Sequence, residues 1–338
     1  MQDGRHITET SLAGLKKGEW LEQFARIADE AGYVQPLGKR HLAGFVDEGP
    51  ILLVTFETIQ GIQTLSEHAH PIGWNLVQSE GWSHLAVVSD GDTWFRDARI
   101  YGYFDRLIDD GFFEDFEKVV FYGTGPCGYA AAAYSVAAPG AAVLAIQPQA
   151  TLESGMTEWD DRFAHMRRTS FTDRYGYAPD MLDAAEEAFV VYDPTQDLDA
   201  MHAALFTRPN VSKLRCRNLG EAIQSHMLEM GVLPDLINAV GQGALDDVYF
   251  GEAMRARRTY GPYLRRLMSI TDNAERPYLT ALVCENVLSR MHGPRFRKKL
   301  EDLRAMAERT GVKLPPPHGE ADSEDAEGEN TPEAEVKA

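Results

Sequence analysis

The sequence predicts an α/β protein built on a doubly wound, mostly parallel sheet, and three observations predict it. Short apolar runs rich in β-branched residues recur between residues 51 and 216, and runs of this length suit buried strands. Stretches with helical spacing separate these runs, and strands that alternate with helices form parallel sheets. From about Leu233 the strand pattern stops and apolar residues recur only at helical spacing. The 338 residues suffice for one large or two modest domains.

Each element is expected from its own stretch of sequence. Six strands are expected, at residues 51–56, 84–89, 118–122, 142–146, 188–192 and 211–216. Helices are expected between them, at residues 101–110, 127–137, 199–206 and 222–230. An amphipathic helix over residues 19–30 should pack on the outside, and three or four helices should follow between residues 233 and 310.

Composition divides the chain into four expected regions. They are an N-terminal helical extension (1–48), an α/β domain (49–232), a C-terminal helical region (233–312) and an acidic tail (313–338). From Pro315 to Ala338 there are eight acids and one base, and Val336 is the one large aliphatic residue, so this tail should be solvated and disordered. The segment from Arg255 to Arg304 carries twelve bases against five acids. These bases are either helix exteriors or a docking face for an anionic ligand or for the tail.

Charge and cysteine content exclude several classes of protein. The formal net charge of -19 argues against a general nucleic-acid binder, because neutralising phosphates requires a basic excess. Three scattered cysteines are too few for a disulfide framework and suit a reducing cytoplasm. The first residues lack the basic-then-apolar pattern of a secretory signal, and no run of about 18 apolar residues could span a membrane. A cytoplasmic protein without nucleic-acid or membrane partners is therefore expected.

The stretch from Val119 to Ala133 is the most informative part of the sequence. A strand ends in a glycine-rich turn, and an alanine-rich helix follows at once. Gly123, Gly125 and Gly128 match the G-x-G-x-x-G pattern of dinucleotide-binding turns. That pattern normally follows the first strand of its unit and is completed by an acid about 20 residues on, but residues 146–149 contain none. A dinucleotide-binding oxidoreductase is therefore a minor alternative, and no cofactor is expected.

The same turn resembles the nucleophile elbow of the α/β-hydrolase superfamily, and the resemblance covers residues 51–230. It is similar to bacterial members whose elbow reads glycine–x–serine–x–glycine–glycine–tyrosine–alanine. Laid on that pattern, Gly123 is the first glycine, Gly125 stands in place of the nucleophilic serine, and Cys127 replaces the next glycine. Gly128, Tyr129 and Ala130 complete the match. The resemblance implies the fold of a hydrolase without its attacking oxygen.

The resemblance also implies where an acid and a histidine should lie. The acid should follow a later strand, where Asp193 stands, and the histidine should follow the last strand. Two further acids near the same turn are alternates, Asp197 and Asp199. Glu221 occupies the expected histidine position, while His226 and His202 are poorly placed. Ordinary Ser-His-Asp catalysis is therefore not expected, and a binding, regulatory or scaffold role is the leading hypothesis.

Cys127 supports an alternative, a thiol-dependent hydrolase or acyltransferase that acts on a small acyl or carbonyl substrate. A cysteine near a helix start has its thiol pKa lowered by the helix dipole. Asp193 and Glu221 would then be its candidate catalytic partners. The structural interpretation is that Cys127 is a small buried apolar residue with no catalytic role.

A ligand site is expected at the carboxyl ends of the strands, where the crevice of a parallel sheet lies. Its expected ligand-binding residues are Gly125, Gly128, Asp92, Trp94 and Gln147, with Asp193 nearby. A neutral or mixed-charge small molecule with one negative group should fit best, and a protein partner is the other possibility. His68 and His70 form an H-x-H pair. Without a third ligand, such a pair is weak evidence for a metal site, so no metal is expected. The oligomeric state is left open.

Overall fold

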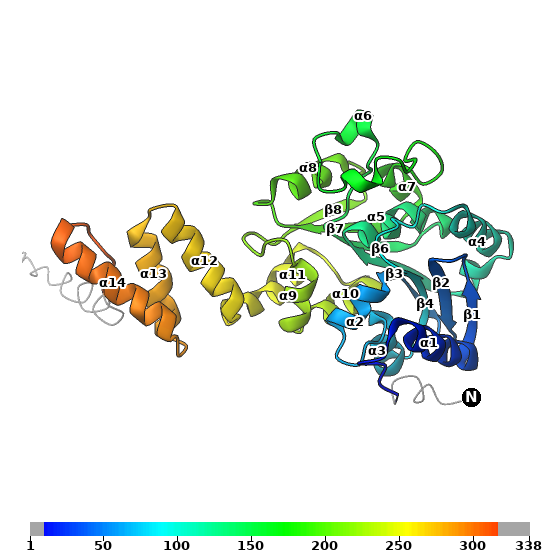
Figure 1. Ribbon diagram of the computed structural model, residues 1–338, viewed down its shortest axis with the longest axis horizontal. Helices are drawn as coiled ribbons and strands as arrows, with labels where there is room; N and C mark the ends of the chain where they lie inside the picture. The colour runs from blue at the N-terminus through cyan, green and yellow to red at the C-terminus, as the bar shows by residue number, and fades with distance from the viewer. Residues whose placement is uncertain (1–9, 317–338) are drawn as a thin grey trace, which may run out of the picture. The chain divides into compact units, whose positions relative to one another are not determined.

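The computed structural model describes residues 10–316, and these fall into two compact units. The first unit extends to Met254 and contains the whole sheet, whereas the second begins at Arg255 and is helical (Figure 1). The division lies later in the chain than the boundary predicted at residue 232. The reason is that the helix over Leu233–Gly241, α10, packs against two central strands of the sheet.

The sheet of the first unit has eight strands in the order β1-β2-β4-β3-β5-β6-β7-β8. All neighbours from β4 to β8 in this order are parallel, while β2 runs antiparallel to both β1 and β4. The strands span Gly32–Pro36 (β1), His41–Val46 (β2), Ile51–Thr58 (β3), Ser83–Ser89 (β4), Lys118–Thr124 (β5), Ala142–Ile146 (β6), Glu187–Tyr192 (β7) and Val211–Arg215 (β8). The predicted fold class, a mostly parallel doubly wound sheet, is confirmed.

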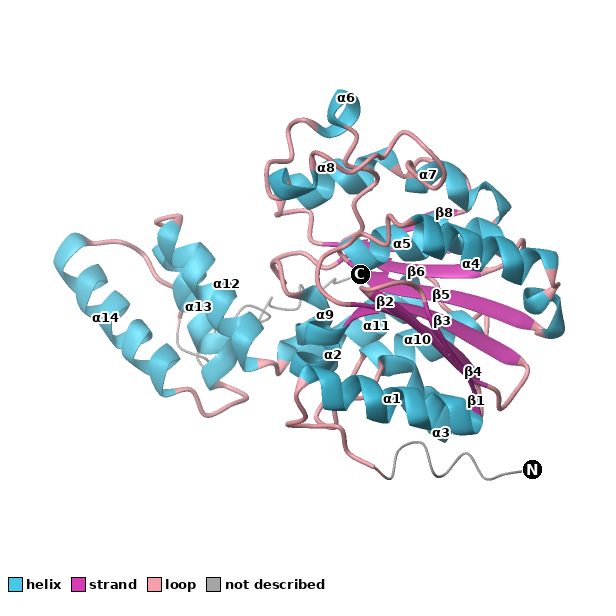
Figure 2. Ribbon diagram, turned by 45° about the vertical axis from the view of Figure 1, so that its right-hand side comes forward, coloured by secondary structure: helices cyan, strands magenta, loops and turns pink. Residues whose placement is uncertain are grey.

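Helices cover both faces of the sheet. α4 (Ala98–Asp109) and α5 (Pro126–Tyr134) lie on one face, and α1 (Lys17–Ala31), α3 (Ile72–Glu80) and α10 lie on the other (Figure 2). The remaining helices of the unit are α2 (Ile59–Leu65), α6 (Ser154–Thr157), α7 (Ala178–Met181), α8 (Asp197–Leu205), α9 (Ile223–Glu229) and α11 (Asp247–Ala253). Two helical layers require strands that are apolar on both faces, and this is why the central strands read as continuous apolar runs.

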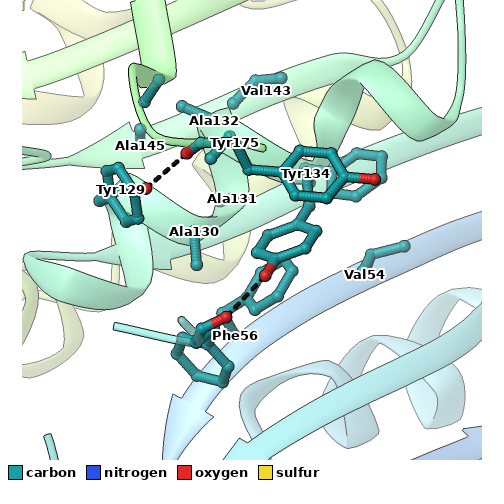
Figure 3. Close-up of a cluster of buried hydrophobic side chains, with 14 of the residues drawn as sticks. Val54, Phe56, Tyr129, Ala130, Ala131, Ala132, Tyr134, Val143, Ala145 and Tyr175 are labelled. Carbon is teal, nitrogen blue, oxygen red and sulfur yellow. Dashed lines mark hydrogen bonds between the residues drawn. The ribbon is translucent and has the colours of Figure 1, made fainter. Parts of the chain in front are cut away.

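Two buried clusters hold these layers to the sheet. Along β4, Leu85 and Val87 join the cluster under α4 and α5, whereas Ala86 and Val88 join the one under α1 and α3. Helix α5 is buried along its whole length, and its run of alanines lets it lie close to the strands (Figure 3). This close approach positions the turn between β5 and α5.

The N-terminal region differs from the prediction. Helix α1 is present, but residues 32–46 form β1 and β2 rather than part of a helical extension. The two strands are short, and β1 lies at the edge of the sheet with none of its residues fully buried, so their apolar pattern is weak. Sequence-based reasoning therefore missed the antiparallel corner of the sheet.

The second unit consists of α12 (Gly261–Asn273), α13 (Pro277–Leu288) and α14 (Pro294–Thr310). It has a small core of its own, which includes Leu264, Cys284, Phe296 and Leu300. The expected three or four helices after residue 233 are thus five, of which two belong to the first unit. The acidic tail lies almost wholly outside the described residues. Within residues 10–316 no helix combines the length and apolarity needed to cross a membrane.

Candidate ligand cavity at the carboxyl ends of β3 and β5

A cavity of about 380 Å³ opens where β3 and β5 end. Its walls come from the last residues of these two strands, α2 and the loop that follows it, and the first turns of α3 and α5, with α9 completing it. Its apolar lining includes Ile62, Leu65, Ile72 and Leu228. The volume is in the range of small-molecule sites, and the position is where ligands bind in open parallel sheets.

The turn between β5 and α5 adjoins this cavity through Thr124 and Cys127. Gly125 has φ 54° and ψ -124°, a backbone conformation that glycine adopts readily and other residues rarely. Its N–H donates to the carbonyl of Ile146 at 2.8 Å. A Cβ atom at Gly125 would meet no other atom within 4 Å, so backbone conformation and not lack of space favours glycine here. The strand-to-helix turn at Gly125 is therefore tight and has a positive φ.

The other two glycines of the turn have a different reason. A Cβ atom at Gly123 would lie 2.2 Å from the carbonyl oxygen of Cys127, and one at Gly128 would lie 3.1 Å from that of Ile146. Both glycines therefore let α5 approach β5 and β6 closely. The G-x-G-x-x-G spacing follows from this packing and needs no bound phosphate.

Pro126 follows Gly125 and begins α5. Proline suits the first turn of a helix because its fixed φ is helical and its missing N–H is not needed there. In this turn the consequence is chemical, since no N–H is available at the position directly after Gly125. Sequence-based reasoning overlooked this residue, although its identity is plain from the sequence.

Glu57 is the acidic group of the cavity, and sequence-based reasoning missed it as well. It is half-buried at the end of β3 and accepts hydrogen bonds from Thr55 Oγ1 at 2.8 Å and the Ile72 N–H at 3.2 Å. Burial raises the pKa of Glu57 to about 7, although both hydrogen bonds act in the opposite direction. The sequence signal was faint: one carboxylate that ends an otherwise apolar strand.

A buried histidine supports Glu57 through Thr55. His84 Nε2 lies 2.9 Å from Thr55 Oγ1. Because the Thr55 hydroxyl donates its proton to Glu57, it accepts one from His84, so the ring carries its proton on Nε2. Burial lowers the pKa of His84 to about 3, which keeps the ring neutral. This chain of hydrogen bonds holds the Glu57 carboxylate at the carboxyl end of β3.

Tyr122 and Cys127 add a hydroxyl and a thiol to the lining of the cavity. The Tyr122 side chain is 1% exposed, and its hydroxyl has no hydrogen-bond partner among the described residues. Burial raises the pKa of Tyr122 well above its usual range, and Glu57 adds to the effect. Burial likewise raises the pKa of the Cys127 thiol, with further contributions from Glu57 and Asp92. Cys127 thus lies in the cavity as a protonated thiol, and the expected lowering of its pKa by the helix dipole is outweighed.

Asp193 has a structural role in place of the predicted catalytic one. It is fully buried and accepts hydrogen bonds from Thr195 and from the N–H groups of Asn218 and Gly220, the last at 2.7 Å. It therefore ties the turn after β8 directly to the end of β7. Glu221, the next residue along, is exposed and does not line the cavity.

The expected ligand-binding residues after β4 and β6 also lie apart from the cavity. Trp94 is fully buried among aromatic rings, including those of Tyr129 and Phe171, and Asp92 is on the surface 3.0 Å from His165. Two more predicted residues are engaged elsewhere: Gln147 donates to Asp199 at 2.7 Å, and Gly128 packs against the backbone. The expectation of one pocket lined by Cys127 or Gly125 together with Trp94 and Asp193 is not met, because the last two residues have no exposed surface.

Arg96 explains how Trp94 becomes buried. Its guanidinium is almost fully enclosed, donates to Tyr129 and to the carbonyl of Arg174, and is paired with Asp173. It thereby fastens the segment between β6 and β7 over the aromatic cluster. That segment serves as a packed cap over Trp94.

The H-x-H pair lines the cavity without converging on a metal position. His70 Nε2 donates to the carbonyl of Thr10 at 2.8 Å, and its ring lies 5.8 Å from that of His68. In the part of the chain that the structure describes, no three His, Cys, Asp or Glu side chains cluster closely enough to hold a metal ion. His68 is exposed at the rim.

No family model and no curated protein matches the chain. Solved structures similar to it include Est1E from Butyrivibrio proteoclasticus, with 11% identity, a TM-score of 0.38 and coverage of 64% of this chain and 98% of that one. An esterase from the archaeon Pyrobaculum calidifontis has 16% identity and a TM-score of 0.38, with 71% and 93% covered. FphF, a fluorophosphonate-binding serine hydrolase of Staphylococcus aureus, has 10% identity and a TM-score of 0.40, with 61% and 93% covered.

The strand order and the helices on both faces give a mostly parallel, α/β-hydrolase-like sheet, the fold class that the sequence predicted. Of its eight strands, seven run in the same direction and β2 runs opposite to them, and helices flank both faces. The turn with the unusual backbone follows the central strand β5. What this fold does in the present chain depends on the side chains at that turn and in the cavity beside it.

Proposed function

We propose that this protein binds a small molecule in the cavity beside Cys127 and does not hydrolyse esters by a Ser-His-Asp mechanism. The observation that carries the proposal is the β5–α5 turn. It has the backbone of a nucleophile elbow, but Gly125 stands in the place of the nucleophile and Pro126 follows it. A binding role of this kind suits either regulation or scaffolding.

Two of the three parts of hydrolase chemistry are missing from that turn. Glycine offers no oxygen to attack a carbonyl carbon. The oxyanion hole of this fold uses the N–H of the residue after the nucleophile, and proline has none. Removing a single oxyanion donor from a hydrolase typically slows it about 10²–10³-fold, so even a restored nucleophile would act poorly.

The third part, the base, is missing at the turn after β8. In the family a histidine there would bridge the acid and the nucleophile. Here the oxygens of Asp193 bind the N–H groups of Asn218 and Gly220 directly, and the carboxylate is fully buried. The acid therefore supports the turn itself, and there is no place for an imidazole between them.

A serine at position 125 tests whether this turn can support ester hydrolysis. Gly125→Ser has room for its side chain, because a Cβ atom there meets nothing within 4 Å. The positive φ should cost about 1–3 kcal/mol of stability, so the variant should fold with a lowered Tm. Neither it nor the wild type should hydrolyse p-nitrophenyl acetate or butyrate above the buffer rate, or react with a fluorophosphonate probe. Strong ester hydrolysis by the wild type or the single variant would refute the proposal.

The thiol-dependent alternative is favoured by one observation, the presence of Cys127 in the cavity lining. It is opposed by the raised pKa of the thiol, because the thiolate is the nucleophile. In the folded protein at pH 7.5, Cys127 should react with iodoacetamide at least about 100-fold more slowly than free cysteine. Peptide mapping by mass spectrometry gives the rate, and the urea-denatured chain, in which all three cysteines should react, is the control. Rapid labelling of native Cys127 would favour a thiol-dependent enzyme instead.

A further inference from the structure

The charged residues that line the cavity are acidic. Two carboxylates line it, Glu57 within and Glu67 at the exposed rim, and among its described lining residues there is neither lysine nor arginine. At the turn that adjoins it, two backbone positions have no N–H available to an anion. Pro126 has no N–H, and the N–H of Gly125 is bonded to Ile146. An anionic group would therefore meet carboxylates and find no fixed positive charge.

The polar atoms within the cavity have unused capacity to accept hydrogen bonds. A carboxylate has about four lone-pair sites, and Glu57 receives hydrogen bonds from two groups, the Thr55 hydroxyl and the Ile72 N–H. The Tyr122 hydroxyl is buried without a partner among the described residues, and leaving such a group unbonded is unfavourable. Both residues line the same cavity, at the ends of the neighbouring strands β3 and β5.

The rest of the lining is apolar. Ile62 is almost fully buried, and Leu65, Ile72 and Leu228 extend the apolar wall. Such a wall suits the hydrocarbon or aromatic body of a ligand, while a few placed polar groups fix its orientation. A ligand for this cavity therefore needs an apolar body and a head group that donates several hydrogen bonds.

We propose that the cavity binds an organic amine in its ammonium form, with the charged head group at Glu57 and Tyr122 and the apolar body against Ile62 and Leu65. An ammonium has three donors and no acceptor, which matches one carboxylate and one unpartnered hydroxyl oxygen. The inference rests on the proposed binding role and specifies its ligand. It replaces the sequence-based expectation of a negatively charged group on the ligand.

Three probes of matched shape test this assignment: 2-phenylethylamine, 2-phenylethanol and 3-phenylpropanoate, titrated into the full chain by calorimetry at pH 8. The amine should bind at least tenfold more tightly than the alcohol, and the carboxylate more weakly still. Equal or tighter binding of the carboxylate would overturn the assignment. Ester hydrolysis is measured on the same sample, so that a catalytic protein and a wrong ligand class give different results.

Variants locate the amine in the cavity. Glu57→Gln keeps an acceptor for Thr55 and Ile72 but removes the charge, and it should weaken amine binding at least tenfold while leaving binding of 2-phenylethanol within twofold. Tyr122→Phe removes a hydroxyl that has no protein partner, so the fold should be retained and only amine binding should fall. Glu114→Gln, an exposed acid that precedes β5, is the matched control and should bind like the wild type. Unchanged amine affinity in Glu57→Gln and Tyr122→Phe would refute the site.

The pH dependence provides a readout besides affinity. Since the pKa of Glu57 is raised to about 7, the ammonium binds its ionised form and affinity should rise between about pH 6 and 8. The other titratable groups around Glu57 are Tyr122, Cys127, His84, His70, His68 and Glu67. Burial keeps the first two protonated, lowers the pKa of His84 to about 3, and lowers that of His70, which favours its neutral ring. The pH response should vanish in Glu57→Gln and persist in Glu67→Gln and His68→Asn; persistence in Glu57→Gln would contradict the proposal.

Discussion

Replacing Asp160 by alanine should lower the free energy of unfolding by about 3–5 kcal/mol, because it leaves buried polar groups without their shared acceptor. The Asp160 side chain is inaccessible to solvent. It accepts from His202 Nε2 at 2.9 Å and pairs with Arg162 at 2.8 Å. Arg162 in turn pairs with Asp199 at 2.7 Å, so one carboxylate joins α8 to the segment that follows β6.

His202 shows why this aspartate is difficult to replace. Its Nδ1 accepts the N–H of Ala150 at 3.2 Å, so its proton must be on Nε2, which points at Asp160. Without Asp160 that buried N–H would have no acceptor. The pairing resembles the acid–histidine half of a hydrolytic triad, but the pair is fully buried, which assigns it to structure.

Urea unfolding of Asp160→Ala, Asp160→Asn and Asp161→Ala measures the effect. Asp161 is adjacent and exposed, so its replacement should change stability by less than about 0.5 kcal/mol. The asparagine variant retains one acceptor and should lie between the two. A cost for Asp160→Ala below about 1 kcal/mol would show that the network does not hold the cap.

The Asp160 carboxylate should also make the free energy of unfolding depend on pH. Burial acts to raise the pKa of Asp160, but hydrogen bonds from His202 and Arg162 outweigh it, and the pKa is lowered in the folded state. A lowered pKa stabilises the fold above the ordinary carboxyl value of about 4, and this stabilisation is lost as pH falls further. The difference in unfolding free energy between wild type and Asp160→Asn should therefore shrink below about pH 4.

The sequence predicted the central part of the sheet well because burial there leaves a strong signal. Strands β3 to β8 are short apolar runs between helices, and each was expected within a few residues of its observed bounds. β1 and β2 form an antiparallel pair at the edge of the sheet, where alternation over five or six residues is too short to distinguish a strand from a loop.

The sequence predicted where the cavity lies but not which residues line it. The order of elements indicates the carboxyl edge near Gly125, and Cys127 lies in the cavity there. Which residues line the cavity depends on the conformation of long loops, and the sequence does not encode these in any pattern. Trp94 and Asp193 follow strands on opposite sides of β5, and both are buried under loops that fold back on them.

Gly123→Ala should be the most damaging substitution in the β5–α5 turn, with a loss of about 3 kcal/mol or more of stability. The added Cβ atom would lie 2.2 Å from the carbonyl oxygen and 2.4 Å from the carbonyl carbon of Cys127. These are backbone atoms of α5, which is buried along its length, so the helix cannot move away without disturbing its contacts with the sheet. Displacement of α5 would also move Cys127 and open or close the cavity.

Gly125→Ala is the matched control, because it adds the same methyl group two residues along the same turn. Its Cβ atom would meet nothing within 4 Å, so only the strain of a positive φ remains, about 1–3 kcal/mol. Thermal unfolding should therefore rank wild type above Gly125→Ala and Gly125→Ala above Gly123→Ala. Binding of 2-phenylethylamine at 15 °C, below unfolding, should be retained by Gly125→Ala and weakened in Gly123→Ala. The reverse ranking of the two glycines would mean that backbone conformation, and not the close approach of α5 to β5, sets the geometry of the turn.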